Sequence, residues 1–373
     1  MKMQYRRFGK TEEKVSVLGF GCMRFPVTDK ENDASIDEER SIAMIRNAID
    51  TGVNYLDTAF FYHKGMSEKV VGKAIKDGYR EKIFLATKLP LWNVEKEEDF
   101  DTLLNTQLEK LDVDYIDFYL LHAVNKDSWA QKVIPFGILD KMRKAKSEGK
   151  IRHIGFSFHD DLPTFKKVVD EFEDCEFCQI QFSYIDTDYQ AGIEGLQYAA
   201  ERDLGIVIME PLQGGALATP AQPVLDAIGS RNPVKFALDY IWNFPEVSLL
   251  LSGMSNEQQV KDNLVYAAQS KANALTDEEK AVYKKAKEVH DKLDIIPCRD
   301  CRYCLPCPHG VEIPKVFKTF NEGVANANRR LILEIYPDIE ANANQCQKCG
   351  ECEAKCPQHI EIINKLKAVR NAL

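Results

Sequence analysis

The chain has 373 residues, of which 45% are hydrophobic and 29% are charged. This is the composition of a folded globular protein, and it excludes a disordered chain, a collagen-like repeat and a disulfide-stabilised miniprotein. No apolar run approaches the roughly 18 residues of a membrane helix, and the polar first ten residues lack the apolar core of a signal peptide. We therefore expect a cytoplasmic protein without a membrane partner. The net charge of −9 argues against a nucleic-acid partner.

Eight short runs rich in Val, Ile, Leu and Phe alternate with amphipathic stretches up to about residue 270. This alternation predicts strand–helix units in an α/β fold, and eight units favour a (β/α)8 TIM barrel over an open doubly wound sheet. Two short extended runs around Gly9 and Lys10 predict a hairpin that closes the bottom of the barrel. The predicted strands are Val17–Cys22, Asn54–Ala59, Ile83–Lys88, Ile116–His122, His153–Ser157, Cys178–Ser183, Gly205–Pro211 and Val247–Gly253.

The cysteines indicate a second domain, because eight of the eleven lie in the last 76 residues. Thr276 and Glu279 form the pattern of a capping box, so a charged helix should begin there. We expect a barrel over residues 1–275, a linker helix over 276–297 and a small, mostly helical domain over 298–373.

Polar side chains stand where several predicted strands end. Asp57 ends the second strand, with Tyr62 in the loop beyond it, while Lys88 ends the third strand and His122 the fourth. Active sites of barrels form at this end, and such a group suits proton transfer to a carbonyl oxygen, with Tyr62 as the general acid. We expect Lys88 to lower the pKa of Tyr62, Asp57 to hold Lys88, and His122 to orient the carbonyl. A single Lys or His at a strand end is more often structural, so the joint pattern carries this prediction.

These residues resemble the aldo/keto reductase family over about residues 1–290. The matching motifs are Asn54-Tyr55-Leu56-Asp57-Thr58-Ala59 with Tyr62, Ala86-Thr87-Lys88, Tyr119-Leu120-Leu121-His122, Lys150-Ile151-Arg152-His153-Ile154-Gly155-Phe156-Ser157, and Gln181. The resemblance implies reduction of an aldehyde or ketone by hydride from NADP(H) or NAD(H), with Asp57, Tyr62, Lys88 and His122 as the catalytic tetrad. It also implies that the cofactor contacts Gly21, Cys22, Met23, Asp57, Ser157, Gln181, Met209, Gly253, Gln259 and Asn263.

The chain departs from that family pattern at several positions. Phe158 replaces an asparagine that helps to hold the carboxamide in many relatives, and Met209 replaces a tyrosine that stacks on the nicotinamide. Gly253 and Gln259 stand where many relatives carry the Lys and Arg that bind a 2′-phosphate, which leaves the choice between NADP and NAD open. The connection at residues 63–66 is longer than usual and should alter the substrate pocket.

Two cysteine runs in the tail predict iron–sulfur clusters. The first, C-x2-C-x2-C-x2-C-P, comprises Cys298, Cys301, Cys304 and Cys307; the second, C-x2-C-x2-C-x3-C-P, comprises Cys346, Cys349, Cys352 and Cys356. Two zinc sites are the alternative, but the triple spacing followed by Cys-Pro is typical of 4Fe-4S clusters. The tail resembles two-cluster ferredoxin domains, with helix-like segments at Val316–Glu322 and Arg329–Ile335. That resemblance implies one cluster on Cys298, Cys301, Cys304 and Cys356, and another on Cys346, Cys349, Cys352 and Cys307.

Three functions remain open on the sequence. The leading one is a nicotinamide-dependent carbonyl reductase that carries two 4Fe-4S clusters. In the second, the protein transfers electrons and the barrel is a docking or redox-sensing module. In the third, the clusters only fasten the tail. From residue 298 onward 11 basic residues stand against 9 acidic ones, so an acidic electron carrier such as a ferredoxin is a candidate partner, beside the small carbonyl substrate.

Overall fold

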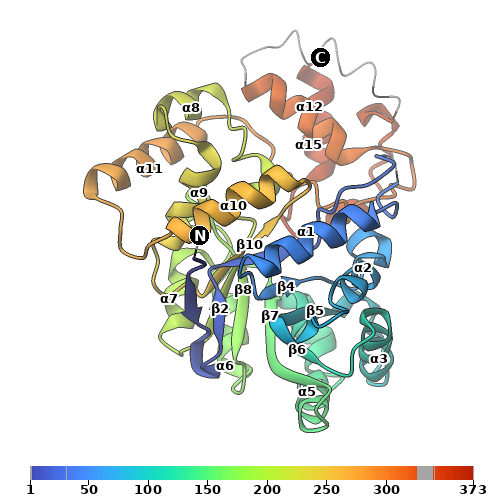
Figure 1. Cartoon of the computed structure of the whole chain (residues 1–373). Helices are drawn as coiled ribbons and strands as arrows, with labels where there is room; N and C mark the ends of the chain where they lie inside the picture. The colour runs from blue at the N-terminus through green and yellow to red at the C-terminus, as the bar shows by residue number, and fades with distance from the viewer. Residues whose placement is uncertain (1, 31, 326–338, 340, 373) are drawn as a thin grey trace. The chain divides into compact units, whose positions relative to one another are not determined.

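The computed structural model describes residues 2–30, 32–325, 339 and 341–372 (Figure 1). The chain forms two compact units: Met1–Phe182, Asp186–Pro211 and Leu238–Ala274 make the first, and Ser183–Ile185, Leu212–Ala237 and Leu275–Leu373 make the second. Helix α11 (Asp277–His290), predicted as part of a linker, thus groups with the cysteine-rich segment. The boundaries at residues 275 and 297 stay a prediction.

The first unit contains a closed barrel of eight parallel strands in the order β10-β3-β4-β5-β6-β7-β8-β9. All eight predicted strands are present, which confirms the (β/α)8 fold, although their ends differ from the predicted ones by up to a few residues. The strands are β3 (Leu18–Gly21), β4 (Tyr55–Asp57), β5 (Phe84–Pro90), β6 (Ile116–Val124), β7 (Ile151–Phe158), β8 (Phe177–Gln181), β9 (Gly205–Met209) and β10 (Leu249–Gly253).

Helices connect the strands, and all of them except the three-residue α4 have buried apolar residues on one face. Helix α1 (Glu38–Asp50) begins after Asp37, whose side chain accepts a hydrogen bond from the Arg40 amide. Helix α2 (Ser67–Ala74) ends before the predicted Gly78, because Asp77 and Gly78 both adopt positive φ. The others are α3 (Asp99–Leu111), α4 (Lys126–Ser128), α5 (Ile138–Ser147), α6 (Leu162–Glu171), α7 (Gly192–Ala200), α9 (Pro233–Trp242) and α10 (Glu257–Gln269).

The predicted hairpin closes the amino-terminal end of the barrel. Strands β1 (Tyr5–Arg7) and β2 (Lys14–Ser16) pair antiparallel, and the buried ring of Phe8 packs against Phe118 and Phe177. Gly9 has φ +52°, and a Cβ there would lie 2.2 Å from the Gly205 nitrogen, so only glycine fits. The carboxyl ends of the strands are thereby left for the candidate site.

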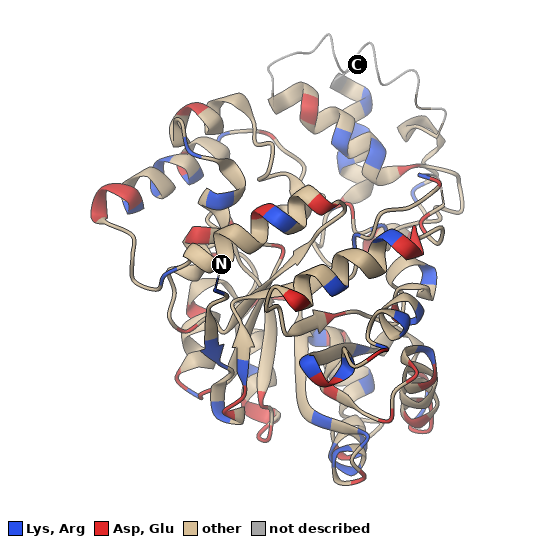
Figure 2. Ribbon diagram, viewed as in Figure 1, with Lys and Arg blue, Asp and Glu red and all other residues tan. Residues whose placement is uncertain are grey.

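The second unit contains α8 (Gln222–Ile228), α11, α12 (Ile313–Ala325), α14 (Glu351–Ala354) and α15 (Ile362–Ala372). Helix α11 begins at the predicted capping box of Thr276 and Glu279, and Figure 2 shows its acidic start. The predicted Val316–Glu322 helix lies in α12, whereas Arg329–Ile335 lies outside the described residues. In the described parts of the chain, no helix has both the length and the hydrophobicity needed to cross a bilayer.

Candidate active site and cysteine-rich region

Each barrel strand contributes one residue of the predicted site at or near its carboxyl end. Five of them are the last residues of their strands: Gly21, Asp57, Gln181, Met209 and Gly253. The other three, Lys88, His122 and Ser157, lie within the last three residues of β5, β6 and β7. Strand register aligns Gly253 with Gly21 and Gly21 with Asp57. The closed barrel therefore places these residues around one end.

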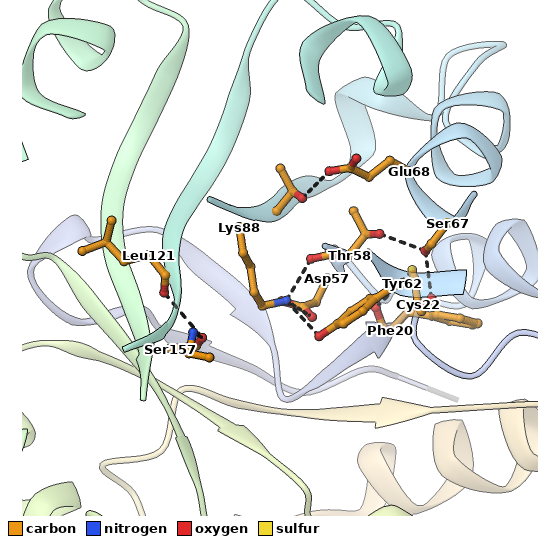
Figure 3. Close-up of polar contacts among 12 residues, drawn as sticks. Phe20, Cys22, Asp57, Thr58, Tyr62, Ser67, Glu68, Lys88, Leu121 and Ser157 are labelled. Atoms are coloured by element: carbon orange, nitrogen blue, oxygen red, sulfur yellow. Dashed lines mark hydrogen bonds and ion pairs between the residues drawn. The ribbon is translucent and has the colours of Figure 1, made fainter. Parts of the chain in front are cut away.

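The Lys88 ammonium lies at the centre of this group (Figure 3). Its Nζ donates to Asp57 Oδ1 at 2.7 Å and to the Thr58 carbonyl at 2.8 Å, and it lies 3.4 Å from the Tyr62 hydroxyl. Lys88 is 1% exposed and Asp57 is 2% exposed, so the two charges form a buried ion pair. The phenol of Tyr62 thus shares its lysine neighbour with a carboxylate.

The acidity of Tyr62 differs from the prediction. Burial raises the pKa of Tyr62 well above its usual value, and the negative charge of Asp57 adds to the rise. The sequence predicted the opposite direction, because that prediction gave more weight to the Lys88 charge than to burial of the phenol and to the Asp57 charge 2.7 Å from the ammonium. Tyr62 therefore holds its proton across the neutral range, which is the state that a general acid needs.

His122 faces Tyr62 from strand β6. The two rings meet edge to face with centroids 6.1 Å apart, and the half-exposed Trp92 ring lies 4.9 Å from the imidazole. Burial lowers the pKa of His122 well below its usual value, with the Lys88 and His159 charges acting in the same direction. His122 is therefore neutral near pH 7 and can donate or accept one hydrogen bond at each ring nitrogen.

A buried polar network, which was not predicted from the sequence, contacts the backbone carbonyl of Lys88. Glu68 Oε1 accepts hydrogen bonds from the Thr87 hydroxyl and the Gln107 amide, both at 2.7 Å. Gln107 also donates to the Lys88 carbonyl at 3.0 Å and accepts from the Tyr119 hydroxyl at 2.7 Å. Burial raises the pKa of Glu68. The signal for this network was a carboxylate within the apolar face of α2, where it replaces a core residue.

Hydroxyl groups join the ends of β3 and β4 beside the lysine. Ser67 Oγ donates to the Cys22 carbonyl at 2.8 Å and bonds the Thr58 hydroxyl at 2.9 Å (Figure 3). The Cys22 amide in turn donates to the Asp57 carbonyl at 2.8 Å. The backbone that bears Asp57 is thereby held from two sides.

Predicted nicotinamide contacts lie along the rest of the barrel end. The Ser157 hydroxyl accepts from the Ala123 amide at 2.8 Å, and Gln181 Nε2 donates to Asp186 at 3.1 Å. Both side chains are buried, and the half-buried Met209 follows on the next strand. Two polar groups beside an apolar side chain can hold an amide-bearing ring between them.

The loop after β10 begins with Gly253 and leads into α10. A Cβ added at Gly253 would lie 2.7 Å from Arg24 Cγ, so the Arg24 stem covers the position where many relatives carry lysine. This arginine was not among the predicted cofactor contacts, although it directly follows one of them, Met23. The Asn256 side chain caps α10 at the Gln259 amide, and the buried Asn263 donates to Ser252 Oγ at 3.0 Å.

The two cysteine runs meet around one small core in the second unit. A small, partly open hollow is lined by the predicted set Cys307, Cys346, Cys349 and Cys352. Six of the eight cysteines pack against the apolar core that includes Val316, Phe317 and Leu366. The proline-flanked Cys307 of the first run thus lies near three cysteines of the second run, and the assignment of ligands to clusters stays a prediction.

The other predicted set also draws on both runs. Burial raises the pKa of Cys298 to about 11, and the neighbouring Cys356 adds to the rise. Burial likewise raises the pKa of Cys304, with contributions from Cys301, Cys298, Cys356 and, from the other predicted set, Cys352. These interactions place Cys356 of the second run beside the cysteines of the first.

The spacing of these thiols bears on the choice between zinc and iron–sulfur. Within the described residues, no three His, Cys, Asp or Glu side chains gather around a single metal position. A tetrahedral zinc site needs four ligand atoms within about 2.0–2.3 Å of one ion, whereas a 4Fe-4S cluster binds each cysteine to a different iron. The choice between the two therefore rests on the cysteine spacing of the two runs, which is typical of 4Fe-4S clusters.

Two family models match the sequence, one over most of the chain and one over the cysteine-rich tail. The aldo/keto reductase family model matches residues 17–286, and a 4Fe-4S dicluster domain model matches residues 297–361. The uncharacterized oxidoreductase YqkF of Bacillus subtilis (strain 168) is 26% identical over 328 residues, which cover 79% of this chain and 98% of that protein. The probable aldo-keto reductase 1 of Glycine max is 31% identical over 222 residues, 57% of this chain and 61% of that protein.

Solved structures agree with the barrel. The aldo-keto reductase AKR11C1 from Bacillus halodurans in its holo form has a TM-score of 0.63 and 26% identity, and the match covers 76% of this chain and 96% of that one. A Klebsiella pneumoniae aldo/keto reductase, solved in complex with NADP and acetate, has a TM-score of 0.61 at 24% identity, with 76% and 95% covered. This chain is therefore an oxidoreductase of the aldo/keto reductase family with a 4Fe-4S dicluster domain at its carboxyl end.

Proposed function

We propose that this oxidoreductase reduces an aldehyde or ketone with NADPH or NADH, and that Tyr62 is the general acid. The buried Lys88 carries this proposal, because it contacts Asp57, the Thr58 carbonyl and Tyr62 at the carboxyl ends of the strands.

The chain's own groups perform the proton chemistry. The nicotinamide, when bound, supplies a hydride to the carbonyl carbon. Tyr62 donates its phenolic proton to the carbonyl oxygen, the product leaves as an alcohol, and a proton from solvent restores the phenol. Neutral His122 donates a hydrogen bond to the same oxygen and orients it, while Lys88 stabilises the charge that remains on Tyr62. Asp57 holds the ammonium in place.

The cofactor site in this proposal follows the barrel end. Ser157 and Gln181 would hold the carboxamide, and Met209 would pack on the ring. The α10 amino terminus would receive the phosphates, since helix amino termini favour anions. Family membership and the buried polar pair on β7 and β8 support this assignment. The full set is Gly21, Cys22, Met23, Asp57, Ser157, Gln181, Met209, Gly253, Gln259 and Asn263.

We assign two 4Fe-4S clusters to residues 298–373. Cys298, Cys301, Cys304 and Cys356 would hold one, and Cys346, Cys349, Cys352 and Cys307 the other. Such clusters accept and release single electrons. The exposed Cys349 supports electron exchange at the surface near the second cluster, with a carrier such as a ferredoxin as the partner.

The test is a panel of aldehydes and ketones assayed anaerobically with NADPH and with NADH. Tyr62→Phe removes one hydroxyl and should lower turnover by a factor of roughly 10² or more, the usual scale for a general acid. Tyr79→Phe is the matched control, because its exposed hydroxyl bonds Asp50 away from the site. Turnover in Tyr62→Phe equal to that of the wild type would overturn the assignment.

A further inference from the structure

The backbone directly after Tyr62 adopts a strained conformation. His63 has φ 53° and ψ 45°, Lys64 has φ 53° and ψ 33°, and Gly65 has φ +88°. Two successive non-glycine residues in the left-handed region are uncommon, because their Cβ atoms crowd the backbone. Such strain persists only where surrounding contacts hold it. The contacts of His63 are the strongest candidates.

Both ring nitrogens of His63 are bonded to the segment between β3 and α1. Nε2 lies 3.1 Å from the Phe25 amide nitrogen, and Nδ1 lies 2.8 Å from the Asp33 carbonyl oxygen. The Phe25 ring also stacks on the imidazole with centroids 5.7 Å apart. The His63 side chain is 2% exposed, so it is fixed within the protein and does not reach solvent.

These partners determine which of the two imidazole nitrogens carries the hydrogen. A backbone amide only donates, so Nε2 must accept, and a carbonyl oxygen only accepts, so Nδ1 must carry the hydrogen. His63 is therefore neutral and in one tautomer, although the Asp33 carboxylate lies 3.3 Å from Nδ1. The His63 side chain thus connects the backbone at residues 25 and 33 to the turn that directly follows Tyr62.

The joined segment also borders the proposed cofactor site. It starts at Cys22, whose amide bonds the Asp57 carbonyl, and continues through Met23 to a bridge between Val27 and Ile36. Tyr62 directly precedes His63 in the chain, and Phe25 follows closely after Cys22 and Met23, which are expected to contact the nicotinamide. The bond between His63 and Phe25 therefore joins the backbone of Tyr62 to the backbone expected to contact the cofactor.

We propose that His63 is a positioning residue: its neutral imidazole clamps Phe25 to the Tyr62 turn and so sets the distance between the phenol and the proposed nicotinamide. This inference rests on the proposed function. The bond to the Phe25 amide is the essential one, because Phe25 directly follows Cys22, Met23 and Arg24 at the end of β3. Displacing a catalytic group by about 1 Å can cost as much as roughly 10² in rate.

Two substitutions separate the clamp from backbone strain. His63→Gln can place its side-chain oxygen near Nε2 and accept from Phe25, whereas His63→Asn reaches only the Nδ1 position. Asparagine tolerates positive φ better than glutamine does. The clamp therefore predicts that glutamine retains more activity than asparagine, and relief of strain predicts the reverse. Lys64→Asn is the control, since Lys64 has the same φ but an exposed side chain.

We expect His63→Asn to lower kcat by roughly tenfold or more with little change in KM, and His63→Gln to remain within about threefold of the wild type. Hydrogen exchange at the Phe25 amide should be slow in the wild type and His63→Gln and fast in His63→Asn. In a Tyr62→Phe background, His63→Asn should cause no further loss, because residues that act through one group are not additive.

Several results would overturn the clamp: wild-type kcat in His63→Asn, an additive loss in the Tyr62→Phe background, or greater activity in the asparagine variant than in the glutamine one. An unchanged Phe25 amide in His63→Asn would do so as well. The Phe25 exchange needs no substrate. If the wild type reduces no carbonyl, the proposed function and the role of His63 in it both fail, while exchange still reports the clamp itself.

Discussion

Replacing Lys88 by methionine should destabilise the barrel, because the buried carboxylate of Asp57 loses its ion-pair partner. In the wild type the two side chains are 2.7 Å apart, 1% and 2% exposed. Methionine fills much of the volume but leaves the carboxylate buried without a counterion. Removing one partner of a buried ion pair costs about 3–5 kcal/mol. We expect a loss of that size at pH 8.

The loss should depend on pH with a definite sign. Burial already raises the pKa of Asp57 in the wild type, and Lys88 opposes that rise by its charge and its hydrogen bond. Without Lys88 the pKa of Asp57 rises further above the unfolded value near 3.9, so the folded state binds the extra proton. Stability then falls as pH rises through the interval between the two pKa values, by at most about 1.4 kcal/mol per pH unit. Lys88→Met should be closer to wild type at pH 5 than at pH 8.

Urea unfolding followed by tryptophan fluorescence measures this loss in the barrel, because Trp92, Trp129 and Trp242 all belong to the first unit. The control is the double variant with Asp57→Asn, which removes the buried charge and should recover most of the stability. It should not recover turnover, since Tyr62 still lacks its lysine. Equal midpoints for Lys88→Met and wild type at pH 8, or a double variant as unstable as the single one, would refute this account.

Three further predictions concern the site and the tail. The kcat of the wild type should be nearly constant from about pH 6.5 to 9, because the pKa of Tyr62 is raised and that of His122 is lowered out of this interval. A clear rise or fall of kcat within this pH interval would contradict the assignment. Anaerobically prepared protein should contain about eight iron atoms per chain. Cys352→Ser should lose at least one cluster, whereas the control Cys178→Ala should keep all the iron, because Cys178 is buried in the barrel. Excess NADPH or NADH should leave the cluster absorbance unchanged, because hydride carries two electrons and a cluster accepts one, and no flavin motif occurs in the sequence. Fast bleaching of the clusters would contradict this prediction and would indicate a bound group that splits the electron pair.

The strands and the converging residues were predictable because their signals are local. Short apolar runs mark the strands, and a polar residue after such a run marks its carboxyl end. Closure of the sheet then requires Asp57, Lys88 and His122 to meet, whatever the details of packing. The cysteine runs are equally local, since their spacing lies within eleven residues.

The supporting groups could not be predicted in the same way, because they depend on which side chains become neighbours after packing. Glu68 reads as an ordinary helix residue until Thr87 and Gln107 are placed against it. The stem of Arg24 reaches Gly253 from a distant part of the sequence. The sequence indicated only a long connection at residues 63–66, since neither the burial of His63 nor its two backbone partners is visible in it.

The direction of the Tyr62 pKa shows why burial decides the chemistry. A lysine near a tyrosine favours the phenolate only if its charge is not already neutralised, and here Asp57 is closer to Nζ than the phenol is, at 2.7 Å against 3.4 Å. The ion pair therefore acts on Tyr62 more as a dipole than as a cation, and desolvation prevails. A phenol with a raised pKa is too weak an acid to protonate a neutral carbonyl, but it can protonate the more basic oxygen that forms as hydride arrives. In the proposed reaction, proton transfer from Tyr62 would consequently accompany or follow hydride transfer. The tyrosine would have to be in position at that moment, and this is the condition that the proposed role of His63 meets.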